Sequence, residues 1–164
     1  MKLKTFMLIV ACTVISHLTQ AQLKSTPFCP PFSVDILDGN VNKLYAESPW
    51  GDIKFRLPCF TEAIPEPSTN GCAGIFFKDR GVSFYTYRDY IEITDKFNGT
   101  MSLPIMGADH NSVFKWLGSP KMKDNSWDAY QMRYGVLVVY FDSTGKINKI
   151  QISSKSVETL RLCD

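Results

Sequence analysis

The residue pair best suited to proton transfer in this sequence is Asp109–His110. A carboxylate beside an imidazole can assist a nucleophile, because the carboxylate fixes the orientation and the tautomer of the ring. Val113, Phe114 and Leu117 follow at helical spacing, which places Asp109 at an N-cap and His110 in the first helical turn. A capping Asp beside an exposed His needs no catalytic role, and we favour this structural interpretation.

Motifs of the well-known enzyme classes are missing from the sequence. It contains no pattern typical of nucleotide loops, zinc proteases, serine esterases or calcium loops. Asp35, Asp38 and Asp142 stand beside turn residues, and we expect them to shape turns rather than to act as paired glycosidase acids. We therefore predict a non-enzymatic protein without metal or cofactor. The alternative is a small secreted hydrolase, which requires a second ionisable partner close to His110 or a buried carboxylate pair in a cleft.

Four cysteines follow the N-terminal export segment described below, namely Cys29, Cys59, Cys72 and Cys163. In an exported chain they predict two disulfides, for which three connectivities exist. We expect Cys59–Cys72 to close a local loop and Cys29–Cys163 to join the two ends of the chain. No two of these residues have the close spacing of zinc ligands, which argues against a metal site.

Two predicted strands, residues 82–87 and 130–134, alternate in side-chain type. If helices cover one face of the sheet, the polar positions of both strands lie on the open face. These positions are Ser83, Tyr85, Tyr87, Gln131 and Arg133. Tyr and Arg are enriched in the buried centres of protein interfaces, so we predict that this set binds a protein partner.

Two short helices are expected to support these strands. The first is predicted to begin with Ser48 as N-cap and Pro49 in the first helical position, and to end at Pro58. The second is predicted to begin at Asp109 and to end at Gly118.

A β-rich block follows each predicted helix, at residues 74–93 and 127–152, and Asp142–Gly145 is a strong hairpin turn. Each unit therefore contains a helix and three antiparallel strands, which indicates an internal duplication. The expected fold class is α+β, an antiparallel sheet with helices on one face, built from two tandem units. We divide the chain into a signal peptide (1–21), an extended arm (22–47), a first unit (48–94) and a second unit (95–164), with both units fused into one compact domain.

The second unit, mainly residues 109–152, resembles the SmpA/OmlA lipoprotein domain and its structural relative, β-lactamase-inhibitory protein. The resemblance rests on Val113, Leu117-Gly118-Ser119-Pro120, Tyr134-Gly135 and the run VYFDSTGKI at 139–147. The shared pattern is a short helix ending in Leu-Gly-x-Pro, then a strand meander with an Asp-x-x-Gly-Lys turn. The first unit departs from it, with Pro58 in place of Gly118 and no such turn. The resemblance implies a non-enzymatic envelope or secreted module that acts through the open face of its sheet.

The first 21 residues have the pattern of a secretory signal peptide. Lys2 and Lys4 form a positive start, residues 6–15 are apolar but too short to span a bilayer, and Ala21 precedes the expected cleavage site. The alternative is a lipoprotein signal, in which Cys12 carries a lipid and anchors the chain. Both readings predict an exported protein, periplasmic or extracellular.

Charge narrows the range of partners. Lys2 and Lys4 belong to the signal, so 16 of the 18 basic residues remain, against 16 acidic residues. A neutral chain argues against nucleic acid and against anionic membranes, and no later segment is apolar enough to span a bilayer. We predict a secreted or envelope binding protein that acts on a protein partner, as an inhibitor, immunity protein or envelope-assembly factor.

Overall fold

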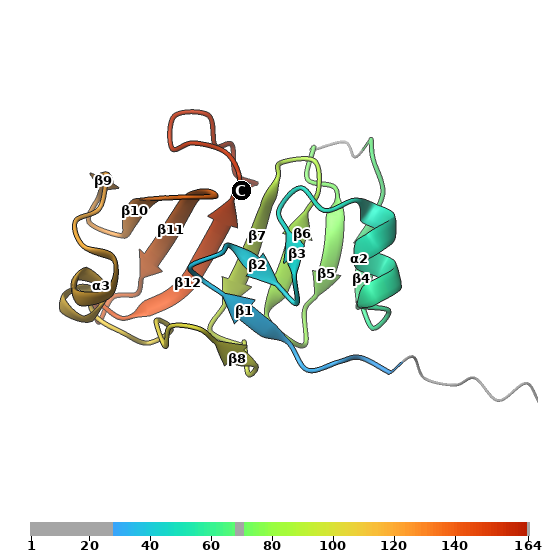
Figure 1. Ribbon diagram of the computed structural model, residues 1–164, viewed down its shortest axis with the longest axis horizontal. Coiled ribbons are helices and arrows are strands. Elements are labelled where there is room, and N and C mark those ends of the chain that lie inside the picture. The colour runs from blue at the N-terminus through green and yellow to red at the C-terminus, as the bar shows by residue number, and fades with distance from the viewer. Residues whose placement is uncertain (1–27, 68–70, 164) are drawn as a thin grey trace, which may run out of the picture.

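The computed structural model describes residues 28–67 and 71–163, and the expected signal peptide with its cleavage site lies outside this part of the chain. The fold is α+β and mostly β, with two sheets and two helices among the described residues (Figure 1). The helices are α2 (Trp50–Arg56) and α3 (His110–Leu117). Neither is long and apolar enough to cross a membrane.

A large sheet of eight strands forms the body of the molecule, and every neighbouring pair in it is antiparallel. Its order is β4 (Glu62–Ile64), β5 (Gly74–Phe77), β6 (Val82–Tyr85), β7 (Tyr90–Thr94), β12 (Ile147–Ser153), β11 (Gly135–Phe141), β10 (Trp127–Met132) and β9 (Met122–Lys123). The last strands of the two blocks, β7 and β12, pair in the middle of the sheet.

A small sheet lies in front of the large one in the view of Figure 1. Its order is β3 (Leu44–Tyr45), β2 (Asn40–Val41), β1 (Ser33–Asp35) and β8 (Thr100–Met101), with β1 and β8 parallel. The prediction of an extended arm at 22–47 is therefore wrong for residues 33–45, which form three strands of this sheet. Val34 and Val41 of these strands are fully buried, and Asn42 and Lys43 have the positive φ angles of a two-residue hairpin turn.

One apolar core joins these layers. Alternate residues of the long strands point into it, as in β6, where Val82 and Phe84 are fully buried while Ser83 and Tyr85 are partly exposed. Ile53 of α2 is fully buried in the same cluster, as are Val113 of α3 and Val34 of β1. Full burial of one such side chain contributes about 1.5–3 kcal/mol, so this cluster holds both helices on the sheets.

The two helices begin in different ways. Asp109 caps α3 as expected, because its side chain accepts a hydrogen bond from the Ser112 amide at 2.9 Å. The expected Ser48 cap of α2 is wrong, since the Ser48 hydroxyl instead accepts from the Tyr45 amide at 2.8 Å. The helix begins after Pro49 without a side-chain cap.

Two disulfides use the four expected cysteines, but their pairing differs from the expectation. The bonds are Cys29–Cys59 and Cys72–Cys163. Cys29 precedes the small sheet and meets Cys59 just beyond the end of α2. The C-terminal segment returns across the large sheet, where the Cys163 amide donates to the Tyr90 hydroxyl at 3.1 Å. The pairing therefore follows from which cysteines the fold brings together, and not from their closeness in sequence.

Candidate functional site

The large sheet has a core face, whose side chains belong to the main core, and an outer face, whose side chains do not. Cross-strand register aligns the outer face in rows. One row is Ser83, Glu92, Gln151, Val138 and Ala129. The next row is Tyr85, Tyr90, Ser153, Val136 and Gln131, and a third contains Thr94, Lys149, Tyr140 and Trp127.

Ser83, Tyr85 and Gln131, three of the five residues proposed for binding, share this outer face. They do not form one contact cluster, because β7, β12 and β11 lie between β6 and β10. Neighbouring strands are about 4.8 Å apart, so Ser83 and Tyr85 on β6 lie about 19 Å across the sheet from Gln131 on β10.

Tyr85 is tied into the aromatic packing of the outer face. Its ring stacks on Tyr90 at 4.4 Å between centroids and meets Phe76 edge-on at 5.4 Å. Tyr90 is fully buried, and burial raises the pKa of both phenols. Tyr85 is therefore a half-buried packing residue.

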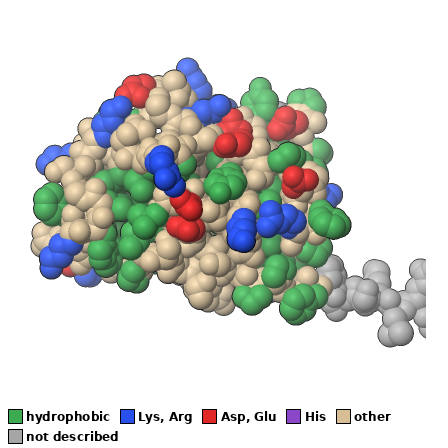
Figure 2. Space-filling view, viewed as in Figure 1, with side chains coloured by type: hydrophobic (Ala, Val, Ile, Leu, Met, Phe, Trp, Pro, Cys, Tyr) green, Lys and Arg blue, Asp and Glu red, His purple; other side chains and the backbone are tan. Residues whose placement is uncertain are grey.

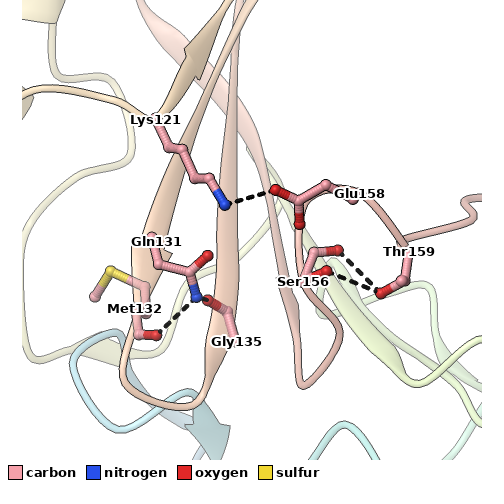
Figure 3. Close-up of polar contacts among 7 residues, drawn as sticks. All are labelled: Lys121, Gln131, Met132, Gly135, Ser156, Glu158 and Thr159. Carbon is pink, nitrogen blue, oxygen red and sulfur yellow. Dashed lines mark hydrogen bonds and ion pairs between the residues drawn. The ribbon is translucent and has the colours of Figure 1, made fainter.

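The other proposed residues lie at the strand ends. Tyr87 is beyond β6 and 57% exposed, with the Arg88 guanidinium over its ring. Arg133 pairs with Asp38 at 2.9 Å, which draws it toward the small sheet and away from the outer face. Gln131 folds its amide back onto the β10–β11 turn, where Nε2 donates to the carbonyls of Met132 (3.2 Å) and Gly135 (2.7 Å) (Figure 3).

The C-terminal segment, residues 154–163, covers part of the outer face. Its Val157 and Leu160 pack against Ala129, Val136 and Val138. Figure 3 shows the ion pair that holds the segment beside β9, with Lys121 Nζ 2.6 Å from a carboxylate oxygen of Glu158. The hydrogen bond from Lys121 is the main cause that lowers the pKa of Glu158 to about 2.

An apolar hollow of about 270 Å³ remains between this segment and the strands. It is lined by Trp127, Ala129, Val138, Tyr140, Val157, Leu160 and Leu162. Trp127 and Tyr140 are partly exposed cross-strand neighbours, so the hollow has an aromatic wall that solvent can reach.

A polar chain borders this aromatic wall. The Tyr140 hydroxyl donates to Gln151 at 2.8 Å, and the Gln151 amide donates to Glu92 at 2.8 Å. Lys149 Nζ lies 4.2 Å from the centre of the Tyr140 ring and 3.7 Å from Glu92. Burial raises the pKa of Tyr140 to about 12, so this phenol stays protonated and donates throughout the neutral range. These hydrogen bonds hold the Tyr140 side chain in one orientation.

A second polar site lies on the core face beside α3. His110 Nδ1 is 3.1 Å from Asp128 Oδ2, and the imidazole stacks on Phe141 at 3.6 Å between centroids. The Tyr130 hydroxyl donates to the same Asp128 oxygen at 3.4 Å. His110 therefore has the ionisable partner that the hydrolase alternative requires. In the part of the chain that the structure describes, no hydroxyl or thiol forms a hydrogen bond with the imidazole.

Comparison with known protein families, with characterised proteins and with solved structures finds no significant match. The resemblance to the SmpA/OmlA domain therefore stays a hypothesis. The function must be inferred from the geometry of the chain itself.

Sequence reasoning missed the residues that line the hollow. Trp127 lies four residues before Gln131 on the same strand. Extending the alternation from Gln131 through Ala129 therefore places Trp127 on the outer face. The His110–Asp128 pair has no comparable signal, because the two residues are 18 positions apart and meet only through the packing of α3 on β10.

Proposed function

We propose that this chain is an exported, non-enzymatic protein that binds another protein through the outer face of its large sheet. The observation that carries the proposal is the apolar hollow bordered by Trp127 and Tyr140. Its two disulfides suggest an oxidising, exported environment. The partner classes remain those expected from the sequence: an inhibited target, an immunity target or an envelope-assembly component.

The chemistry of the outer face supports a protein as partner. Protein interfaces have an apolar, aromatic centre and a polar rim, and Trp, Tyr and Arg supply most of their binding energy. Here the hollow provides the centre, while Lys149 and Glu92 form a rim of both charges. One apolar side chain of a partner fits the volume of the hollow. Tyr85 and Ser83, beyond Glu92, extend the same face toward β5.

The two-unit architecture is part of the same proposal. It is supported by the element order, in which a helix, a short edge strand and three longer strands occur twice. It is also supported by the pairing of β7 with β12 and by the burial of Ile53 and Val113 in one cluster. The resemblance to β-lactamase-inhibitory protein covers mainly the second unit, and it extends to the first unit if that unit is a divergent copy.

Capture of a partner from the native envelope extract tests the proposed function. The mature protein is immobilised beside Trp127→Ala and a matched control, Trp116→Ala, which removes a 39% exposed Trp of α3. We expect Trp127→Ala to weaken capture of the partner by at least tenfold, which corresponds to a hot-spot loss of about 1.4 kcal/mol or more. Equal capture by wild type and Trp127→Ala, with both variants folded by circular dichroism, contradicts the outer face as the binding surface.

A small secreted hydrolase is the second candidate, favoured by the His110–Asp128 pair in its cavity. A hydrolase of this kind needs a nucleophile or an activated water at the imidazole. Turnover of ester, amide and glycoside substrates by wild type, and its loss in His110→Ala, would establish this function. The outer-face variants would then keep full turnover.

A further inference from the structure

A cavity of about 540 Å³ opens between α3 and the β9–β10 end of the large sheet. It is distinct from the outer face, because Asp128 points to the core face while its neighbour Trp127 points to the outer one. Figure 2 shows apolar side chains gathered on the left of the molecule, between the region of α3 and the strands. Phe114 of α3 is 57% exposed and lines the cavity together with Tyr130.

Asp128 lies in the wall of this cavity and is only 4% exposed. Its Oδ2 accepts from His110 and Tyr130. Its Oδ1 is buried and has no hydrogen-bond partner among the described residues. An ionised carboxylate has about four lone-pair sites, so half of this group is left without a donor.

A buried carboxylate oxygen without a donor is unusual in folded proteins. Leaving a buried polar atom unpaired costs about 1–3 kcal/mol, and more for a charged group. Native proteins relieve such positions with water, an ion or a ligand. A carboxylate accepts only, so the missing group must be a donor, and a positively charged donor forms the stronger bond.

The remaining lining favours a cation. Asp124 adds a second carboxylate, and among the residues that the structure describes Lys123 is the only Lys or Arg in the wall. The lining also includes Phe114 and Tyr130, and aromatic rings attract cations. Burial and the neighbouring Asp128 carboxylate raise the pKa of Tyr130 to about 12, so its hydroxyl stays protonated and donates to Oδ2 throughout the neutral range.

We propose that this cavity binds a positively charged nitrogen group, an ammonium or a guanidinium, through the carboxylate of Asp128, which lacks a donor on one oxygen. Such a group belongs either to a small organic cation or to a Lys or Arg side chain of a protein. The proposal does not depend on the outer face, and the two sites have separate readouts.

Lys123 provides an internal competitor for this site. It is the cross-strand partner of Asp128, so its side chain leaves the sheet on the same face. Among the described contacts its ammonium group forms no ion pair, and the residue is exposed. Rotation of the Lys123 side chain can bring its ammonium group close to Asp128, where it competes with a bound cation for the carboxylate. Removing it must therefore strengthen binding of an external cation.

Calorimetric titration with defined probes tests the proposal. The cationic probes are butylammonium, butylguanidinium and the capped amino acids N-acetyl-lysine amide and N-acetyl-arginine amide. Uncharged controls are butanol and N-acetyl-norleucine amide. The proteins are wild type, Asp128→Asn, which removes the charge at constant size, and Lys123→Met, which removes the competitor at an exposed position. Thermal melts check that each variant is folded.

We expect the cationic probes to bind and the uncharged controls not to bind. Asp128→Asn should weaken cation binding by at least about tenfold, because it removes a charge-assisted hydrogen bond. Lys123→Met should strengthen it by about threefold or more. Binding of the capped residues but not of the butyl cations would assign the site to a protein side chain, and equal binding would assign it to small organic cations.

Three results would overturn the proposal. One is equal affinity of cationic and uncharged probes for the wild type. The second is unchanged cation binding in folded Asp128→Asn. The third is absence of binding to both wild type and Lys123→Met, which would mean that water alone occupies the cavity. Lys123→Met keeps the test decisive if Asp128→Asn does not fold, since the expected gain in affinity is measured on an exposed position.

Discussion

A single ion pair attaches the C-terminal segment to one side of the outer face. Glu158 and Lys121 form the one ion pair of the described residues that attaches residues 154–163 to the β9 side of the sheet. Both side chains are about half exposed, so solvent screens the attraction and the pair contributes little to global stability. Its effect is local, because it positions Val157 and Leu160 over the strands.

The pH dependence of this attachment follows from Glu158. Its pKa is lowered to about 2 from 4.5, chiefly by the Lys121 hydrogen bond, so the contribution is fully present above about pH 4.5 and is lost as the pH falls toward 2. Glu158→Gln should therefore melt slightly below wild type at pH 7, and the difference should fade between pH 4.5 and 2. Differential scanning calorimetry across this range measures it. Lys121→Met should have the same effect, and the double variant should lose no more than either single variant. A difference that persists unchanged at pH 2 would contradict this assignment.

At the scale of elements, the long strands were predictable from the sequence and the short ones were not. β10, β11 and β12 have six or seven residues, enough to show alternation, and the 142–145 turn has a Gly at the required positive φ. The small sheet has strands of two or three residues, too short for a period of two to stand out. Its assembly depends on β8, which is more than 50 residues away in sequence from β2 and β3.

The candidate site was predictable only as far as alternation extends. The pattern correctly separates Ser83 from Phe84 and Gln131 from Tyr130. It contains no information on strand order, and the three strands between β6 and β10 separate the two groups. Tyr87 and Arg133 lie just beyond the strand ends, where alternation no longer determines which face a side chain takes.

The β10–β11 turn offers a test of the sheet itself. Gly135 has a φ of +144°, and a Cβ at this position would overlap the carbonyl oxygen of Ser153 on β12. Gly145, in the β11–β12 turn, has a φ of +75° but nothing within 4 Å of a Cβ. We expect Gly145→Ala to lower the free energy of unfolding by about 1–2 kcal/mol, from backbone strain alone. Gly135→Ala should lower it by more than about 3 kcal/mol, because strain and a backbone clash combine. Urea titration of both variants measures these values, and equal losses would mean that β11 and β12 do not approach as described.

At the scale of the whole molecule, the two disulfides anchor opposite layers. Cys29–Cys59 joins the segment that precedes the small sheet to the residues just beyond α2, whereas Cys72–Cys163 joins the C-terminal segment to the loop before β5. Digestion of the non-reduced protein with a glutamate-specific protease separates Cys59 from Cys72, because Glu62 lies between them. Mass spectrometry should then find Cys29 linked to Cys59 and Cys72 linked to Cys163. A peptide joining Cys29 to Cys163 would restore the pairing expected from the sequence.

Cys72–Cys163 also links stability to the proposed binding face. Its loop of 91 residues is longer than the 30-residue loop of Cys29–Cys59, so in the chain-entropy view its loss costs about 4.6 kcal/mol against about 3.6 kcal/mol. Opening it also frees Leu160 and Leu162, which form one wall of the apolar hollow.

The double variant Cys72→Ser/Cys163→Ser should therefore lose both stability and partner capture. Cys29→Ser/Cys59→Ser should lose stability but keep capture, because neither residue touches the hollow. Both variants are compared at a temperature where urea titration shows each to be folded, so that the loss of capture reflects the open wall and not unfolding. If the two variants capture the partner equally well, the C-terminal segment is not part of the binding surface, and the hollow beside Trp127 is a packing defect rather than a docking site.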